Sequence, residues 1–153
     1  MLVMKQYDMD LREYLRQNQL TWIERIKIVN DISVALSRIH KVGMIHKNLH
    51  PGNILYSRHY NYWFIGDLGF CSPTVKQSKI YGNLPYIAPE VITREYNVSS
   101  DIYSLAMIMW EISSGQMPFA NCENDYDLAL NIAEGTRPKI VWIRFLSFIF
   151  TLT

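Results

Sequence analysis

The spacing of hydrophobic residues predicts a helix-rich fold. Residues from Asp10 to Gln17 have the pattern of a short helix. Thr21 followed by Glu24 is a capping-box pattern, in which each side chain binds a free backbone N–H at the start of a helix. The apolar positions that follow cover a wide arc before the chain reaches Gly43. A helix with so wide an apolar arc is usually buried on most of its sides.

The middle of the chain has the pattern of a β-hairpin. Short apolar runs at 54–56 and 62–65 are interrupted by His, Pro, Gly and Asn. Polar residues that collect in loops beside such a hairpin are candidates for function. Helical spacing then returns from Asp101 to Ser113 and ends at Gly115, and a shorter helix is expected from Asp127 to Glu134.

Composition and charge are those of an ordinary globular domain. The 153 residues suit one domain, and 49% are hydrophobic against 19% charged, which excludes a disordered chain. Fifteen basic and fourteen acidic residues leave a net charge of +1, which gives no support for nucleic acid or an anionic membrane as a partner. The apolar residues 141–153 are fewer than the roughly 20 that a membrane-spanning helix needs. We therefore expect a cytoplasmic protein without a nucleic-acid or membrane partner.

Four local patterns occur in a fixed order in the chain. They are Ile45-His46-Lys47-Asn48-Leu49-His50-Pro51-Gly52-Asn53-Ile54-Leu55, Gly66-Asp67-Leu68-Gly69, Gly82-Asn83-Leu84-Pro85-Tyr86-Ile87-Ala88-Pro89-Glu90 and Ser100-Asp101-Ile102-Tyr103-Ser104-Leu105. A lone Asp-Leu-Gly arises by chance in many turns, but the ordered series is far more specific. It resembles the catalytic loop, the metal-binding DFG segment, the APE segment and the central helix of eukaryotic protein kinases. The resemblance runs from about Leu2 to Pro138.

This resemblance implies a fold and a domain organisation. The expected fold is protein-kinase-like, of the α+β class, with a mainly α-helical carboxy-terminal lobe, a small β-hairpin and no amino-terminal β lobe. Residues 1–140 are expected to form a partial kinase domain, from the hinge through the helix after the central helix. Residues 141–153 are expected to be an apolar tail outside the family pattern. The preference between Ser/Thr and Tyr hydroxyls in a protein substrate stays open.

The resemblance also implies ATP and Mg²⁺ as cofactors. Asp67 offers a carboxylate and Asn53 an amide oxygen, which are ligands that suit magnesium. His46 would lie in the core beside the hairpin, and Asp101 would accept backbone N–H groups of the catalytic loop. The residues expected at the adenine ring are Met4, Lys5 and Tyr7 in the hinge strand and Leu55 beneath the ring.

Several positions of the expected catalytic centre depart from the family pattern. Asn48 stands at the position of the catalytic base, where the family uses Asp, and an amide cannot accept the proton of a substrate hydroxyl as a carboxylate does. Loss of a positioned general base costs about 10²- to 10⁴-fold in rate. His50 replaces the Lys of serine/threonine kinases, and Asn83 replaces their Thr near the base. We therefore expect weak or absent catalysis, and, without the amino-terminal lobe that would cover the nucleotide, weak nucleotide binding.

Three functional interpretations stay open at this stage. The chain is an impaired protein kinase, a pseudokinase-like module that binds protein partners without turnover, or a non-functional fragment of a kinase gene. An exposed apolar surface where another lobe would dock, with hydrophobic self-association through it, would mark the last two. A zinc cluster is a competing interpretation of the histidines, and the kinase loop accounts for their spacing better. These histidines are His40, His46, His50 and His59.

Overall fold

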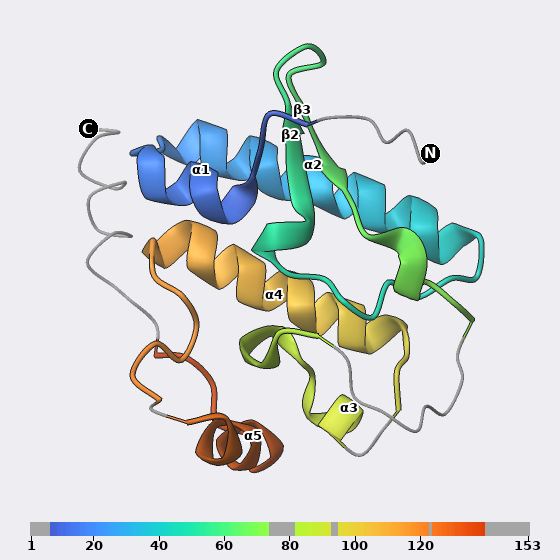
Figure 1. The fold of residues 1–153 in the computed structure, drawn as a ribbon, viewed down its shortest axis with the longest axis vertical. Coiled ribbons are helices and arrows are strands. Elements are labelled where there is room, and N and C mark those ends of the chain that lie inside the picture. Colours follow the sequence, from blue (N-terminus) through green and yellow to red (C-terminus); the bar gives the residue numbers. More distant parts are fainter. Residues whose placement is uncertain (1–6, 74–81, 93–94, 123, 140–153) are drawn as a thin grey trace, which may run out of the picture.

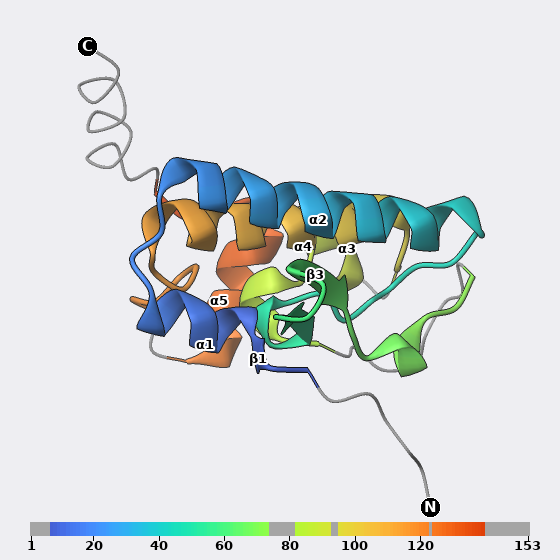
Figure 2. The same ribbon diagram turned by 90° about the horizontal axis from the view of Figure 1, so that it is seen from above.

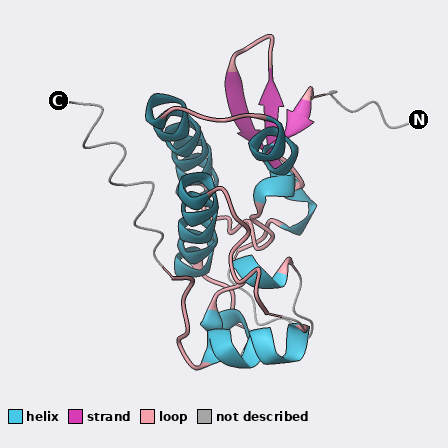
Figure 3. Cartoon of the chain, turned by 90° about the vertical axis from the view of Figure 1, so that its left-hand side faces the viewer, coloured by secondary structure: helices cyan, strands magenta, loops and turns pink. Residues whose placement is uncertain are grey.

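The computed structural model describes residues 7–73, 82–92, 95–122 and 124–139 (Figure 1). The helices of this part are α1 (Leu11–Gln17), α2 (Trp22–Lys41), α3 (Pro89–Ile92), α4 (Val98–Ser114) and α5 (Asp125–Ala133), and its strands are β1 (Met9–Asp10), β2 (Ile54–Ser57) and β3 (Tyr62–Ile65). Figure 3 shows the strands at one end of the molecule and α5 at the other. The expected helix-rich fold with a small hairpin is confirmed.

The sheet is antiparallel, with the strand order β1-β2-β3. The predicted hairpin is β2 paired with β3, and its register places Ile54 opposite Ile65. The sequence pattern missed β1, because two residues are too few to show the alternation of a strand. In β1, Met9 pairs with Tyr56 of β2. This pairing fixes the start of α1 beside the hairpin.

Side-chain caps set where the first two helices begin. Asp10 precedes α1 and its Oδ1 accepts the backbone N–H of Glu13 at 2.8 Å. The predicted capping box of α2 is present, because Thr21 and Glu24 each accept the other's backbone N–H. The helix ends at Lys41, two residues before Gly43, which has a φ of 74°. A glycine takes this left-handed conformation at little cost, as the pattern predicted.

The later helices begin earlier than their apolar spacing indicated. α4 starts at Val98 rather than at Asp101, because Asn97 and Ser100 form a second capping box. α5 starts at Asp125, because Asn124 accepts the backbone N–H of Asp127 at 2.9 Å. Polar caps of this kind carry no hydrophobic spacing, so periodicity alone placed both helix starts too late.

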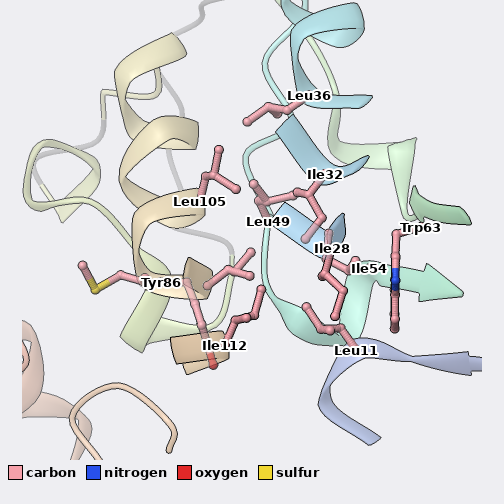
Figure 4. Close-up of a cluster of buried hydrophobic side chains, with 12 residues drawn as sticks. Leu11, Ile28, Ile32, Leu36, Leu49, Ile54, Trp63, Tyr86, Leu105 and Ile112 are labelled. Carbon is pink, nitrogen blue, oxygen red and sulfur yellow. The ribbon is translucent and has the colours of Figure 1, made fainter. Parts of the chain in front are cut away.

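The core lies between α2, α4 and the segment that joins α2 to the sheet (Figure 4). In Figure 2 the long helix α2 runs above α4, and in Figure 1 this segment passes between the two helices. Its buried residues include Leu11, Ile28, Ile32, Leu36, Leu49, Ile54, Trp63, Tyr86, Leu105, Met107, Ile108 and Ile112. Burying one such side chain stabilises a fold by about 1.5–3 kcal/mol. Because Leu49 belongs to the loop between α2 and β2, that loop is fixed to the core at its centre.

Some expectations concern parts of the chain outside the described residues. The hinge residues Met4 and Lys5 and the apolar tail at 141–153 are among them. Within the described residues, no helix has both the length and the hydrophobicity that a membrane crossing requires.

Candidate functional site

The loop at 45–53 is anchored on one buried carboxylate from the start of α4. Asp101 is 1% exposed. Its Oδ2 accepts the backbone N–H of His46 at 2.8 Å, and its Oδ1 accepts that of Lys47 at 3.0 Å. This confirms the predicted role of Asp101. A third contact, which the sequence pattern did not predict, joins Oδ2 to Nε2 of His40 at 2.8 Å. A buried carboxylate is stable only when its oxygens are satisfied in this way.

His46 joins this loop to the segment after β3. Its side chain is fully buried, as predicted. Nδ1 accepts the backbone N–H of Asn48 at 3.3 Å, so Nε2 carries the proton and donates to the carbonyl oxygen of Gly66 at 2.9 Å. The ring therefore holds Asn48 and the residue before Asp67 at fixed positions relative to each other.

Three of the predicted site residues meet through hydrogen bonds. The amide Nδ2 of Asn48 donates to Oδ2 of Asp67 at 2.9 Å. Nδ2 of Asn53 donates to the backbone carbonyl of Asn48 at 2.8 Å and to the same Asp67 oxygen at 3.4 Å. The structure thus brings the base position and both expected metal ligands together at one place.

Backbone conformation and close packing position Asp67. Its φ of 54° is left-handed, which is uncommon for a residue other than glycine. At Gly66, just before it, an added Cβ would lie 2.7 Å from Cδ1 of Leu55. Leu55, the residue expected beneath the adenine, therefore packs directly against the strand end that presents Asp67. A larger residue at position 66 would displace the Leu55 side chain.

His50 lies close to the three-residue cluster, and its ring is half-buried. Nδ1 of its ring accepts the backbone N–H of Gly52 at 3.1 Å, and the ring centre is 6.4 Å from that of Tyr86. Burial, with smaller effects from the charges of Arg12 and His46, holds the pKa of His50 below its usual range. The ring is therefore mostly neutral near pH 7.

The remaining predicted adenine residue, Tyr7, lies at the edge of the sheet. Its ring centre is 5.5 Å from that of Phe64 in β3. Met4 and Lys5 lie outside the described residues, so the expectation for the hinge stays a prediction for these two positions.

Two polar contacts near the site were missed by sequence reasoning. Lys47 is 6% exposed, donates through Nζ to Oγ of Ser72, and lies 5.6 Å from the centre of the Tyr96 ring. Its backbone φ of 70° is left-handed. The second contact is between Tyr86 and α4, where the hydroxyl of Tyr86 donates to Oε2 of Glu111. Neither pair has a recognisable spacing, because the partners are 25 residues apart in both cases.

The oxygens at the site suit a hard cation better than zinc. The hydrogen bonds between these residues use Oδ2 of Asp67 and Nδ2 of Asn53, and oxygens such as Asp67 Oδ1 and Asn53 Oδ1 are of the kind that binds Mg²⁺ together with phosphate oxygens and water. Among the described residues, no three His, Cys, Asp or Glu side chains cluster in a way that could hold a metal ion. Asp67 and Asn53 are the predicted site residues whose oxygens could hold Mg²⁺ here.

The site thus presents a carboxylate from the segment after β3 and an amide from the loop at 45–53, which Asp101 anchors. The model of the protein kinase domain matches residues 1–147. The chain therefore belongs to the protein kinase family.

Curated relatives carry a more specific description. The chain is 32% identical to a dual serine/threonine and tyrosine protein kinase of Mus musculus, 31% identical to that of Homo sapiens and 28% identical to that of Strongylocentrotus purpuratus, each over 144 residues. Each alignment covers 91% of this chain and 15% of the relative. The chain thus spans about 15% of the length of these relatives.

Proposed function

We propose that this chain binds Mg²⁺–ATP and a protein substrate in the manner of a protein kinase, and that Asn48 strongly slows phosphoryl transfer to protein hydroxyls. The observation that carries the proposal is that Asn48 and Asn53, on the loop anchored by Asp101, meet Asp67 of the segment after β3. Phosphoryl transfer depends mainly on position and charge, so this arrangement supports the binding half of the reaction. We place this activity in the cytosol.

The residues divide into two binding groups. Asp67 and Asn53 would hold Mg²⁺, which supplies positive charge to the phosphate oxygens when it is bound. The residues proposed at the adenine are Met4, Lys5, Tyr7 and Leu55. Leu55 packs against Gly66, so adenine contacts and metal contacts lie on adjoining residues of the hairpin and the loop that follows it.

The proposed loss of rate has two physical causes. Asn48 lies at the base position, and its amide N–H donates to Asp67, so no side-chain group there takes up the substrate proton. His50, which replaces a permanently charged Lys, has a lowered pKa and is mostly neutral. Together they remove a base and a cation from the transition state, and the base alone accounts for about 10²- to 10⁴-fold.

A phosphorylation assay that compares the chain with Asn48→Asp tests this function. The variant restores a carboxylate, and we expect it to transfer phosphate about 10²- to 10⁴-fold faster than the natural sequence. Asp67→Asn serves as the control, because it removes the proposed metal carboxylate and should abolish any transfer. Equal, measurable rates for the natural chain and Asn48→Asp would contradict the role given to Asn48.

A pseudokinase-like module that binds a protein partner is the second candidate. Large apolar side chains are exposed on α2 and α5, among them Ile23 at 81%, Ile26 at 62% and Tyr126 at 79%. Where such side chains gather on one surface, they favour association with another protein or with a second copy of this chain. Sedimentation of the purified chain distinguishes these outcomes: self-association gives a mass that rises with concentration, whereas the kinase proposal alone expects a monomer.

A further inference from the structure

Two side-chain amides converge on one oxygen of Asp67. Nδ2 of Asn48 is 2.9 Å from Oδ2, and Nδ2 of Asn53 is 3.4 Å from the same atom. An ionised carboxylate oxygen only accepts hydrogen bonds, so the Asn48 amide presents its N–H, and not its oxygen, to Asp67.

The interaction between the side chains at positions 48 and 67 would turn from attractive to repulsive if the base position carried a carboxylate. With Asp at position 48, two negative groups would face each other at hydrogen-bond distance, and like charges so close are destabilising unless a cation or a proton lies between them. With Asn at position 48, the same space holds an attractive hydrogen bond to a charged acceptor, which is among the stronger kinds. Asp67 also has a left-handed backbone, so its position depends on such support.

We propose that Asn48 is a positioning residue that holds the carboxylate of Asp67 in place in the metal-free chain. If position 48 carried an Asp, a cation would be needed to stabilise it beside Asp67. The hydrogen bond from Asn48 stabilises the Asp67 carboxylate without a cation. The arrangement of Asn48, Asn53 and Asp67 is then formed before any divalent ion binds. This inference concerns the residues of the proposed nucleotide site, but it rests on the proposed function only for the identity of the ion.

Thermal melts test the proposal under two conditions, first with a chelator and then with millimolar Mg²⁺. Both are recorded at low ionic strength and without nucleotide. With chelator, Asn48→Asp should lower Tm by about 2–4 °C. Mg²⁺ should recover most of this loss, while it changes the Tm of the natural chain little. Asn121→Asp is the matched control, because Asn121 is exposed in the connection between α4 and α5 and the charge change is the same. It should show neither effect.

The exchanged pair, Asn48→Asp with Asp67→Asn, sharpens the test. It places the amide at position 67 and the carboxylate at position 48, so the hydrogen bond is restored in reverse and Tm with chelator should return to within about 1 °C of the natural value. Asn48→Ala, which removes the donor without adding charge, should lose less than Asn48→Asp and should not respond to Mg²⁺. This variant keeps the test decisive if Asn48→Asp does not fold.

Equal melting of the natural chain, Asn48→Asp and Asn121→Asp, with the same response to Mg²⁺, would overturn the proposal. Failure of the exchanged pair to recover any Tm would overturn it as well. None of these melts contains ATP, so they stand apart from the proposed function. If the chain proves not to bind nucleotide, the positioning role of Asn48 is still measured.

Discussion

Asp101 and Asp67 are two carboxylates of one functional region in opposite surroundings. Asp101 is 1% exposed, and its oxygens accept three donors from α2 and from the loop at 45–53. Asp67 is exposed, and two side-chain amides approach one of its two oxygens. A buried carboxylate must be fully satisfied to be tolerated, whereas an exposed one is not under this constraint. The burial of Asp101 points to a role in stability, whereas the exposure of Asp67 is compatible with the binding role proposed for it.

The largest expected effect follows from removing the buried carboxylate. Asp101→Ala leaves the N–H groups of His46 and Lys47 without their acceptor inside the fold, and we expect a loss of about 3–5 kcal/mol in the free energy of unfolding. Asp67→Ala should lose less than about 1 kcal/mol, because its groups reach water. Urea denaturation of both variants checks the difference. Similar losses would contradict the division between the two aspartates.

The next effect concerns the histidine contact to Asp101. His40→Ala removes one donor to a buried charged acceptor and should reduce the free energy of unfolding by about 1.5–3 kcal/mol. His59→Ala is the control, because His59 is exposed and should change stability by no more than about 0.5 kcal/mol. If both variants unfold at the same urea concentration, His40 does not contribute to the anchor.

A buried cation in the same loop should matter much less than the buried anion. Lys47 is 6% exposed and burial lowers the pKa of its ammonium group, while the described residues place no carboxylate within ion-pair distance of it. Lys47→Met keeps the length and removes the charge, and buried charges are often replaced in this way without loss. We expect a change within about 1 kcal/mol in urea denaturation. A loss as large as that of Asp101→Ala would show that the loop needs both charges.

The smallest effect is a pH dependence at His50. Its pKa is lowered in the folded chain by burial, so the unfolded chain takes up the proton more readily. Stability from this ring is present above the unfolded pKa of about 6.5 and is lost as pH falls through the folded value. His50→Gln should therefore flatten the fall of Tm on acidification below about pH 6.5. His59→Gln should keep the natural profile, and an unchanged profile in His50→Gln would exclude this ring as its source.

Local patterns predicted most of the fold. The capping box at Thr21 and Glu24, the end of α4 at Gly115 and the two strands of the hairpin all depend on neighbouring residues, and all are present. The two-residue strand β1 and the starts of α4 and α5 were missed, because they depend on pairing and on polar caps rather than on apolar spacing.

The sequence predicted which residues form the candidate site, but not the hydrogen bonds between them. The ordered motifs identified Asn48, Asn53 and Asp67, and the structure shows that their side chains meet. That Asn48 donates its N–H to Asp67 depends on the orientation of an amide in three dimensions, and no spacing in the sequence encodes it. The same holds for the bond between Lys47 and Ser72.

A thermal melt of the purified chain with ATP, with Mg²⁺ and with both is the most direct test of the proposed nucleotide site. We expect a cooperative transition whose Tm rises by several degrees when ATP and Mg²⁺ are both present, since a ligand at about 100 times its Kd stabilises a fold by about 2.7 kcal/mol. A cooperative transition that ignores nucleotide would contradict the claim that this chain retains the nucleotide site of a protein kinase.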